Sequence, residues 1–425
     1  MKKILLIVLF VTSVYNVKSF SQWFQAGQTV RGEYITNISV PDSNTVWISW
    51  INPDYSSNLL RTTNGGQNWS FVPLPGNGFF LTCSQGIDAQ TAIVGMGTEN
   101  SVLWRTSNAG ISWDTLAKIP GSEAYFDEIS FSKSNPQFGY AVGDRSGEYF
   151  LFKTFNRGQN WNQFTIQNIG LYPSYLSGFA VDSIFFGFQV IITETEFDTY
   201  ITSDGGLSWY RGFSVTNGFG GLAFNDNKLD GIYTSFDFLP MYDKSDDGGL
   251  SWQVRTLNAD SVGENYPVWV SGTNTVFLNS RYDIYRSDNN GDTWISQYHD
   301  SSDMVLHIDY SRYGNIITAY AICLNGKILK SRQTVTTGIH NISSEMPAGY
   351  SLSQNYPNPF NPATKINFSI PKSENVKLKV FDISGRLISE MVNEKLSAGI
   401  YEYELKGINL ASGTYFYRLE AGDLM

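Results

Sequence analysis

The sequence predicts an all-β protein, a seven-bladed β-propeller followed by a small Ig-like β-sandwich. Two observations predict the propeller: an eight-residue phrase occurs six times, and its last residue, tryptophan, recurs every 42 to 48 residues. A repeat of this length that contains four strand-like runs is typical of propeller blades. A third observation predicts the sandwich: after residue 335 the repeat stops, and in the stretch 349–425 alternating apolar runs are separated by Gly and Asn turns.

Residues 1–21 have the pattern of a secretory signal peptide. Lys2 and Lys3 precede the apolar run 4–11, and the small residues Ser19 and Ser21 mark a cleavage point. The apolar run is too short to cross a bilayer as a helix. We therefore expect an exported protein without a transmembrane span. A low content of charged residues (16%) and a high content of aromatic residues (15%) fit a β-rich extracellular protein.

The composition narrows the classes of partner and chemistry. The stretch 22–348 has 18 basic and 31 acidic residues, so it should repel nucleic acid and anionic membranes. Three histidines leave little material for imidazole catalysis or metal binding, and we predict no catalytic residue, metal or cofactor. Cys83 and Cys323 fall in blades that are not neighbours, which predicts two separate buried thiols rather than a disulfide.

The repeated phrase predicts a tight turn between the third and fourth strand of each blade. Its copies are TTNGGQNW (62–69), TSNAGISW (106–113), TFNRGQNW (154–161), TSDGGLSW (202–209), SDDGGLSW (245–252) and SDNNGDTW (287–294). The third residue is Asn or Asp, the fifth is Gly and the eighth is Trp. These turn residues are Asn64, Gly66, Trp69, Asn108, Gly110, Trp113, Asn156, Gly158, Trp161, Asp204, Gly206, Trp209, Asp247, Gly249, Trp252, Asn289, Gly291 and Trp294.

Each constant position has a physical reason. The Asn or Asp oxygen can accept hydrogen bonds from backbone N–H groups further along the turn. Glycine suits a backbone with positive φ, and tryptophan can fill the space between neighbouring sheets. Calcium binding by these residues is an alternative, but four of the six third positions are neutral Asn, whereas a hard cation favours carboxylates.

The spacing also predicts how the ring closes. In the third blade we expect strands at 126–131, 139–142, 149–154 and 161–164. The seventh blade shows three strands at about 305–331 and no repeated phrase, so we expect its fourth strand to come from the segment around Trp23. Such closure removes exposed sheet edges. The propeller then spans 22–335; six blades is the alternative count.

A short polar linker is expected at 336–348, before a separate module at 349–425. The first residues of this module are rich in proline and cannot form a helix. The expected strands of this module are 365–370, 376–382, 387–392, 399–405 and 413–420.

Both parts resemble known families. The repeated turns resemble the Asp-box, or BNR, repeat of sialidases, sortilin-type receptors, xyloglucanase-like glycosidases and the photosystem II assembly factor family, in which the repeat is a structural turn. The stretches NYPNPFNP (355–362), FDISGR (381–386) and SGTYFYRL (412–419) resemble the type IX secretion C-terminal sorting domain. That resemblance implies a Bacteroidota-like source, export by the type IX machinery and attachment or release at the cell surface. Members of that family usually continue with one more strand, so we expect either that this sequence is a fragment or that the module lacks its last strand.

Candidate ligand-binding residues lie in the connections from strand two to three and from strand four to the next blade. These connections share one end of a propeller, where ligands commonly bind. Aromatic side chains there can stack on a ligand, and acids can bond its polar groups. The candidates are Tyr55, Tyr125, Asp144, Arg145, Tyr172, Tyr175, Glu194 and Glu196.

The sequence therefore predicts a secreted, cell-surface, monomeric propeller that binds a glycan or a protein without catalysis. A glycoside hydrolase that uses two loop carboxylates is the alternative. Sialidase chemistry fits poorly, because Arg61, Arg105 and Arg286 directly precede the repeated turns, at the wrong end of the blades. An assembly factor of the photosystem type is disfavoured, because the sorting module directs the chain outside the cell.

Overall fold

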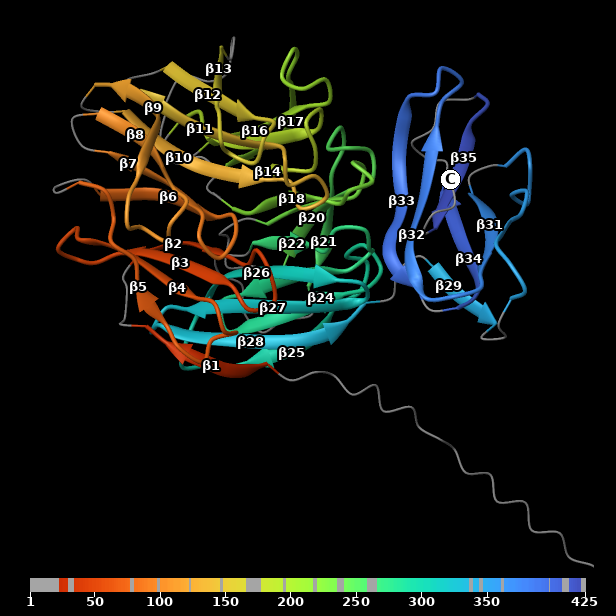
Figure 1. The fold of residues 1–425 in the computed structure, drawn as a ribbon. Coiled ribbons are helices and arrows are strands. Elements are labelled where there is room, and N and C mark those ends of the chain that lie inside the picture. The colour runs from red at the N-terminus through yellow and green to blue at the C-terminus, as the bar shows by residue number, and fades with distance from the viewer. Residues whose placement is uncertain are drawn as a thin grey trace, which may run out of the picture.

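The computed structural model is all-β, and its described part contains no helix. It describes residues 23–29, 34–76, 80–97, 100–121, 124–145, 148–165, 177–193, 196–216, 220–234, 241–257, 266–335, 339–343, 347–360, 363–396, 398–406 and 413–421. The signal peptide expected at 1–21 lies outside these residues. Figure 1 shows a large body of many sheets beside a smaller pair of sheets at the C-terminal end.

Seven four-stranded antiparallel sheets form a seven-bladed propeller. The strands of blades one to four are β2 (Tyr34–Ser39), β3 (Val46–Ile51), β4 (Ser57–Thr62) and β5 (Ser70–Phe71); β6 (Phe80–Gly86), β7 (Ala92–Gly97), β8 (Asn100–Thr106) and β9 (Asp114–Pro120); β10 (Ala124–Phe131), β11 (Gly139–Arg145), β12 (Glu148–Thr154) and β13 (Asn162–Thr165); and β14 (Ser177–Ala180), β15 (Phe186–Ile191), β16 (Glu196–Thr202) and β17 (Tyr210–Thr216). The strands of blades five to seven are β18 (Leu222–Phe224), β19 (Gly231–Tyr233), β20 (Met241–Ser245) and β21 (Gln253–Thr256); β22 (Pro267–Trp269), β23 (Val276–Ser280), β24 (Asp283–Ser287) and β25 (Ile295–His299); and β26 (Val305–Tyr313), β27 (Ile316–Cys323), β28 (Lys327–Thr334) and β1 (Phe24–Gln28).

The ring closes through the first described strand, as the sequence predicts. β1 pairs antiparallel with β28, with Phe24 opposite Lys330 and Gln25 opposite Leu329. Trp23, just before this strand, is buried and packs edge-on against Phe277 of blade six, with ring centroids 6.2 Å apart. The fourth strand of blade seven therefore comes from the opposite end of the propeller sequence, and it covers the edge of β28 that would otherwise be exposed.

The first strand of each blade is its innermost one. Inner strands of neighbouring blades contact each other from β2 to β22, and β26 contacts both β2 and blade six, so the inner strands surround one axis. Because strands alternate in direction, the repeated turns share one end of the propeller with the connections from strand one to two. We call this the turn end. We call the opposite end, where strand two connects to three and strand four to the next blade, the loop end.

Apolar side chains fill the space between adjacent blades. One buried cluster joins blades six and seven through Trp23, Phe277, Ile284 and Leu329. Another joins blades two and three through Cys83, Ile93 and Phe126, among others. The two cysteines, in β6 and β27, are free and buried as predicted.

The C-terminal strands form two sheets, of order β29-β34-β31-β30 and β33-β32-β35. These strands are β29 (Ile339–Ser343), β30 (Ser351–Leu352), β31 (Ala363–Ile370), β32 (Glu374–Phe381), β33 (Leu387–Leu396), β34 (Gly399–Lys406) and β35 (Phe416–Ala421). An apolar cluster that includes Ile366, Phe368, Val376, Leu378 and Leu419 packs between the two sheets.

The segment expected to be a linker, 336–348, contains strand β29. This strand pairs antiparallel with β34, with Ile339 opposite Tyr403 and Asn341 opposite Tyr401. The sequence IHNIS lacks the strict alternation of apolar and polar residues that predicts a strand, because its two isoleucines are three residues apart, and the pairing has a bulge between Asn341 and Ser343. The sandwich therefore takes a strand from the region that its polar composition assigned to a linker.

Candidate functional site

The six repeated phrases form one hydrogen-bonded turn. In each, the first hydroxyl accepts a bond from the N–H of the fifth residue (2.7–3.1 Å) and donates to Oδ1 of the third residue (2.8–3.0 Å). That Oδ1 also accepts from the N–H of the seventh residue at 2.9–3.0 Å. Neutral Asn and charged Asp make the same bonds, so the turn needs an oxygen acceptor and not a negative charge.

The glycine at the fifth position meets two demands at once. All six have φ between 77° and 91°, which is the left-handed region. In five copies a Cβ would also lie within 3.0 Å of another atom, such as Val72 of blade one for Gly110 and Ile93 of blade two for Gly158. The fourth position also has positive φ but accepts Ala109, Arg157 and Asn290. Close approach to the neighbouring blade, added to the backbone angle, explains why the fifth position, unlike the fourth, is always glycine.

Three of the six repeat tryptophans bond to the preceding blade at the turn end. The indole Nε1 of Trp113 donates to Pro73 O at 2.9 Å, and that of Trp252 donates to Gly212 O at 2.9 Å, in each case on the preceding blade. Trp69 reaches Ala26 O of the closing strand at 3.4 Å. The turn end therefore consists of fixed structural contacts.

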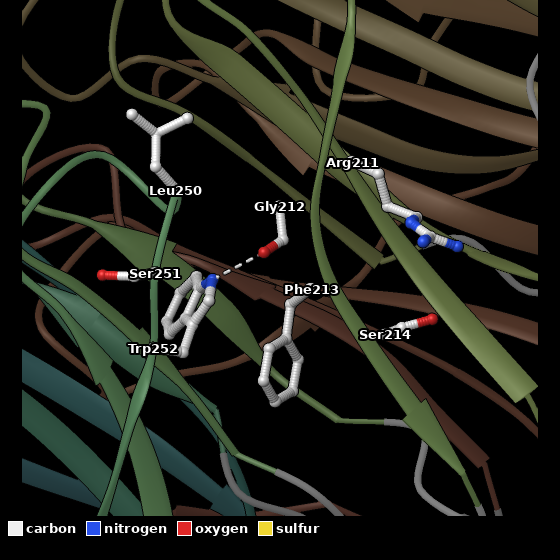
Figure 2. Close-up of a pocket in the computed structure, with 7 residues that line it drawn as sticks. All are labelled: Arg211, Gly212, Phe213, Ser214, Leu250, Ser251 and Trp252. Atoms are coloured by element: carbon white, nitrogen blue, oxygen red, sulfur yellow. Dashed lines mark hydrogen bonds between the residues drawn. The ribbon is translucent and has the colours of Figure 1, made fainter.

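One shallow recess lies near this end, between β17 and the turn of blade five. Figure 2 shows Trp252 bonded to Gly212 and lying beside Phe213, with Arg211 and Leu250 further out. The recess is open to solvent, and none of its lining residues is a carboxylate. It combines the aromatic rings of Phe213 and Trp252 with the polar side chains of Arg211, Ser214 and Ser251, and it offers no carboxylate for acid or base chemistry.

A charged contact joins blades three and seven, which are not neighbours in the ring. Lys133 follows the inner strand of blade three, and its Nζ lies 2.8 Å from the carboxylate of Asp309 on the inner strand of blade seven. Lys133 also donates to Tyr310 O at 3.0 Å, and the Val40 N–H of blade one donates to Asp309 at 2.7 Å. Blades one, three and seven thus meet at one carboxylate.

The loop end holds five of the eight candidate ligand-binding residues. Tyr125 and Asp144 are register partners on β10 and β11, and Arg145 is the next residue, opposite Ala124. The other two lie on different blades. Tyr55, 76% exposed, is in the connection from strand two to three of blade one, and Glu196 is the first residue of β16 in blade four. Tyr172, Tyr175 and Glu194 lie outside the described residues.

Two further acids, Asp127 and Glu128, join this group on the inner strand of blade three. Strand β10 has a bulge between Phe126 and Glu128, so Asp127 is an extra residue on the inner strand. The inner strands β2, β6 and β26 have a bulge at the corresponding place, where Thr36, Thr82 and Leu306 are the extra residues. Comparing the blades position by position singles out blade three, because only its extra residue there is an acid.

Burial changes the protonation of these acids. It raises the pKa of Glu128 to about 8 and that of Asp144 to about 6. The pKa of Asp127 is raised well above its ordinary value, first by burial and then by the neighbouring Asp144 and Glu128 charges. The Oδ2 atom of Asp127 is buried and accepts no hydrogen bond. Blade three therefore holds three acids near the axis whose charges the surrounding described residues do not stabilise.

Glu128 gives a prediction for the pH dependence of stability. Its pKa is about 8 in the folded protein and near 4.5 when the group is free, so between these values the unfolded chain ionises while the folded protein keeps the proton. Stability should therefore fall as pH rises from 4.5 to 8, and Glu128→Gln, which cannot ionise, should avoid part of this loss. We expect the variant to exceed the wild type by about 2 kcal/mol at pH 8 and not at pH 4. Urea unfolding across this range measures the effect, and parallel pH profiles for the two proteins would contradict it.

The inner strand of blade seven contributes a neutral histidine. Burial lowers the pKa of His307 to about 4, although its hydrogen bond to the Ile35 backbone acts in the opposite direction. The Tyr266 ring of blade six lies over it, with centroids 5.0 Å apart. His307 therefore carries no charge at neutral pH and cannot neutralise the acids of blade three.

The described residues give no sign of a metal centre or of a spanning helix. No group of three or more His, Cys, Asp or Glu among them is arranged to hold a metal ion. No helix in the described part of the chain is long and apolar enough to cross a membrane.

Residues 354–424 match the secretion system C-terminal sorting domain, which implies secretion through the type IX system. No curated protein matches the sequence. Among solved structures, YCF48 from Cyanidioschyzon merolae is 17% identical, with 73% of this chain and 98% of that chain covered and a TM-score of 0.50. An ancestral GH74 enzyme is 14% identical, with 86% and 55% covered and a TM-score of 0.52. A chain of the mitotic checkpoint complex is 13% identical, with 78% and 100% covered and a TM-score of 0.52. At these identities the likeness shows the propeller fold alone.

Proposed function

We propose that this chain is an exported cell-surface propeller that binds an extracellular glycan or protein at its loop end, without catalysis. The observation that carries the proposal is the grouping of Tyr125, Asp144 and Arg145 on the paired ends of β10 and β11. An aromatic ring, an acid and a base at one strand end offer stacking, hydrogen bonding and charge to a ligand. The sorting domain supports display outside the cell, with the C-terminal strands as the part that the export machinery handles.

Glycoside hydrolysis is the second candidate, and the raised pKa of Glu128 favours it. An acid that keeps its proton at neutral pH can protonate a leaving group, and a second carboxylate would complete such a mechanism. Against this, Asp127, Glu128 and Asp144 all belong to one blade, on two adjacent strands. Hydrolysis needs two carboxyl groups on opposite sides of the scissile bond, so acids gathered on one side fit binding better.

The two functions are separated by measuring binding and turnover in parallel. We would apply the purified chain to a glycan array and to an array of extracellular peptides, and assay release of reducing sugar from any polysaccharide that binds. We expect Tyr125→Ala and Arg145→Ala each to weaken the ligand about tenfold, with no sugar released. Leu207→Ser, an 89% exposed position at the turn end, is the matched control and should bind normally. Sugar release that is lost in Glu128→Gln would establish the hydrolase instead, and a ligand unaffected by both loop-end variants would overturn the proposal.

A further inference from the structure

Asp144 stands apart from the other buried aspartates of the described chain. Five aspartates are buried, and four of them are bonded to a donor or a cation. The bonded ones are Asp198 with Ser214, Asp283 with His299, Asp303 with Asn325, and Asp309 with Lys133. Asp144 is 5% exposed, yet no hydrogen bond or ion pair joins it to another described residue, and burial is the one cause that shifts its pKa. A buried acid without a partner costs stability unless something else supplies the partner.

The position and surroundings of Asp144 indicate what kind of group could pair with its carboxylate. Asp144 lies between Tyr125 of β10 and Tyr149 of β12 in the register, and Asp127 is the bulged residue directly after the partner of Gly143, so the two acids lie on adjacent strands at the same level of the blade. The buried Oδ2 of Asp127 is also without a hydrogen-bond donor. Two acceptors at one place call for a group that carries positive charge and several N–H donors.

The molecule itself contains the interaction that this region lacks. At the turn end, Lys133 extends to Asp309, donates to a backbone carbonyl and lies over the Tyr310 ring at 5.1 Å. At the loop end, Asp144 has Tyr149 as its register partner on β12 and Tyr125 on β10, but no lysine. The acid and the aromatic rings are thus present, but no cation among the described residues, the neighbouring Arg145 included, is bonded to Asp144.

We propose that Asp144 and Asp127 form a site for the lysine side chain of an extended polypeptide segment. This inference deepens the proposed function by naming the ligand class, and it rests on that function. A lysine ammonium is carried on a flexible four-carbon stem and can reach a carboxylate that is 5% exposed, whereas the amine of an amino sugar is attached directly to a broad ring. The acidic stretch 22–348 adds a general attraction for basic segments.

The test uses short peptides as probes with the purified full chain. Fluorescence anisotropy would compare tetralysine with the same peptide acetylated on every lysine, and would include a glucosamine tetramer to represent an amino sugar. We expect tetralysine to bind, and acetylation, Asp144→Asn or Asp127→Asn each to weaken it at least about tenfold. Asp54→Asn removes the same charge from the connection between strands two and three of blade one, so it controls for general attraction and should bind normally.

A second readout separates loss of the site from loss of the fold. Tetralysine should raise the unfolding temperature of the wild type but not that of Asp144→Asn, whose own unfolding temperature shows whether it folds. The inference would be overturned if tetralysine did not bind, or if the acetylated peptide bound equally well. It would also be overturned if Asp54→Asn weakened binding as much as Asp144→Asn, or if only the glucosamine tetramer bound. If an array ligand lost in Tyr125→Ala does not depend on lysine, the inference fails and the proposed function stands.

Discussion

Trp23→Ala should lower the free energy of unfolding by about 3–5 kcal/mol. The side chain is 4% exposed and fills the boundary between blades six and seven, where it packs against Phe277 and the surrounding apolar cluster. Alanine would leave a cavity beside the strand that closes the ring, so the change removes both buried apolar surface and the anchor of β1. Urea unfolding monitored by far-ultraviolet circular dichroism measures the loss.

Phe24→Ala is the matched control for this prediction. Phe24 is the next residue on the same segment, but its ring is 53% exposed, so its loss should cost less than about 1 kcal/mol. If Trp23→Ala and Phe24→Ala lower the free energy of unfolding equally, the loss does not depend on burial of the side chain. The prediction that Trp23 anchors the closing strand would then be wrong.

Gly110→Ala should destabilise the protein by about 2–4 kcal/mol, from strain and from a steric clash together. Its φ is 84°, where alanine is strained, and the added Cβ would lie 2.4 Å from Val72 and 2.9 Å from the Pro73 carbonyl. Because backbone atoms of blade one cannot yield as a side-chain tip can, the turn would have to move away from its neighbour. The unfolding midpoint in urea and the near-ultraviolet signal of Trp113 report the two consequences.

Ala109→Gly is the matched control, because it exchanges the same two residue types at the neighbouring position of the turn. Ala109 precedes Gly110 and also has positive φ, at 59°, so glycine should be accepted with a change of less than about 1 kcal/mol. A large loss in Ala109→Gly, or a negligible loss in Gly110→Ala, would contradict the account of the constant fifth glycine.

The fold follows from the sequence because its signals are repeated and local. Six copies of one turn fix the position of the last two strands of six blades, and the absence of a seventh copy near Ser331 predicts the exchange with the segment after Trp23. Strand β29 was not anticipated, because five residues without a repeated turn beside them carry a weak signal. Pairing with β34, which is distant in sequence, makes that strand.

The candidate site was less predictable. Tyr125, Asp144 and Arg145 could be selected because the direction of the strands assigns their ends to the loop end. Asp127 can also be noted from the sequence as an acid of the segment 121–128, but its position as the extra residue of a bulge, with Glu128 directly after it, cannot be read there. Nor does the sequence show that Asp144 lacks a partner, since that depends on which side chains of other strands reach it.

The contact between Lys133 and Asp309 bears on how the ring would come apart. Detaching β1 from β28 opens the outer rim between blades seven and one, but Asp309 still holds Lys133 and the Val40 backbone near the axis. A force or a protease that acts on the N-terminal segment would therefore loosen the periphery first and leave blades one, three and seven joined at the centre. The outer rim and the centre of the propeller are stabilised by separate interactions, so loss of the contacts at one does not require loss of the contacts at the other.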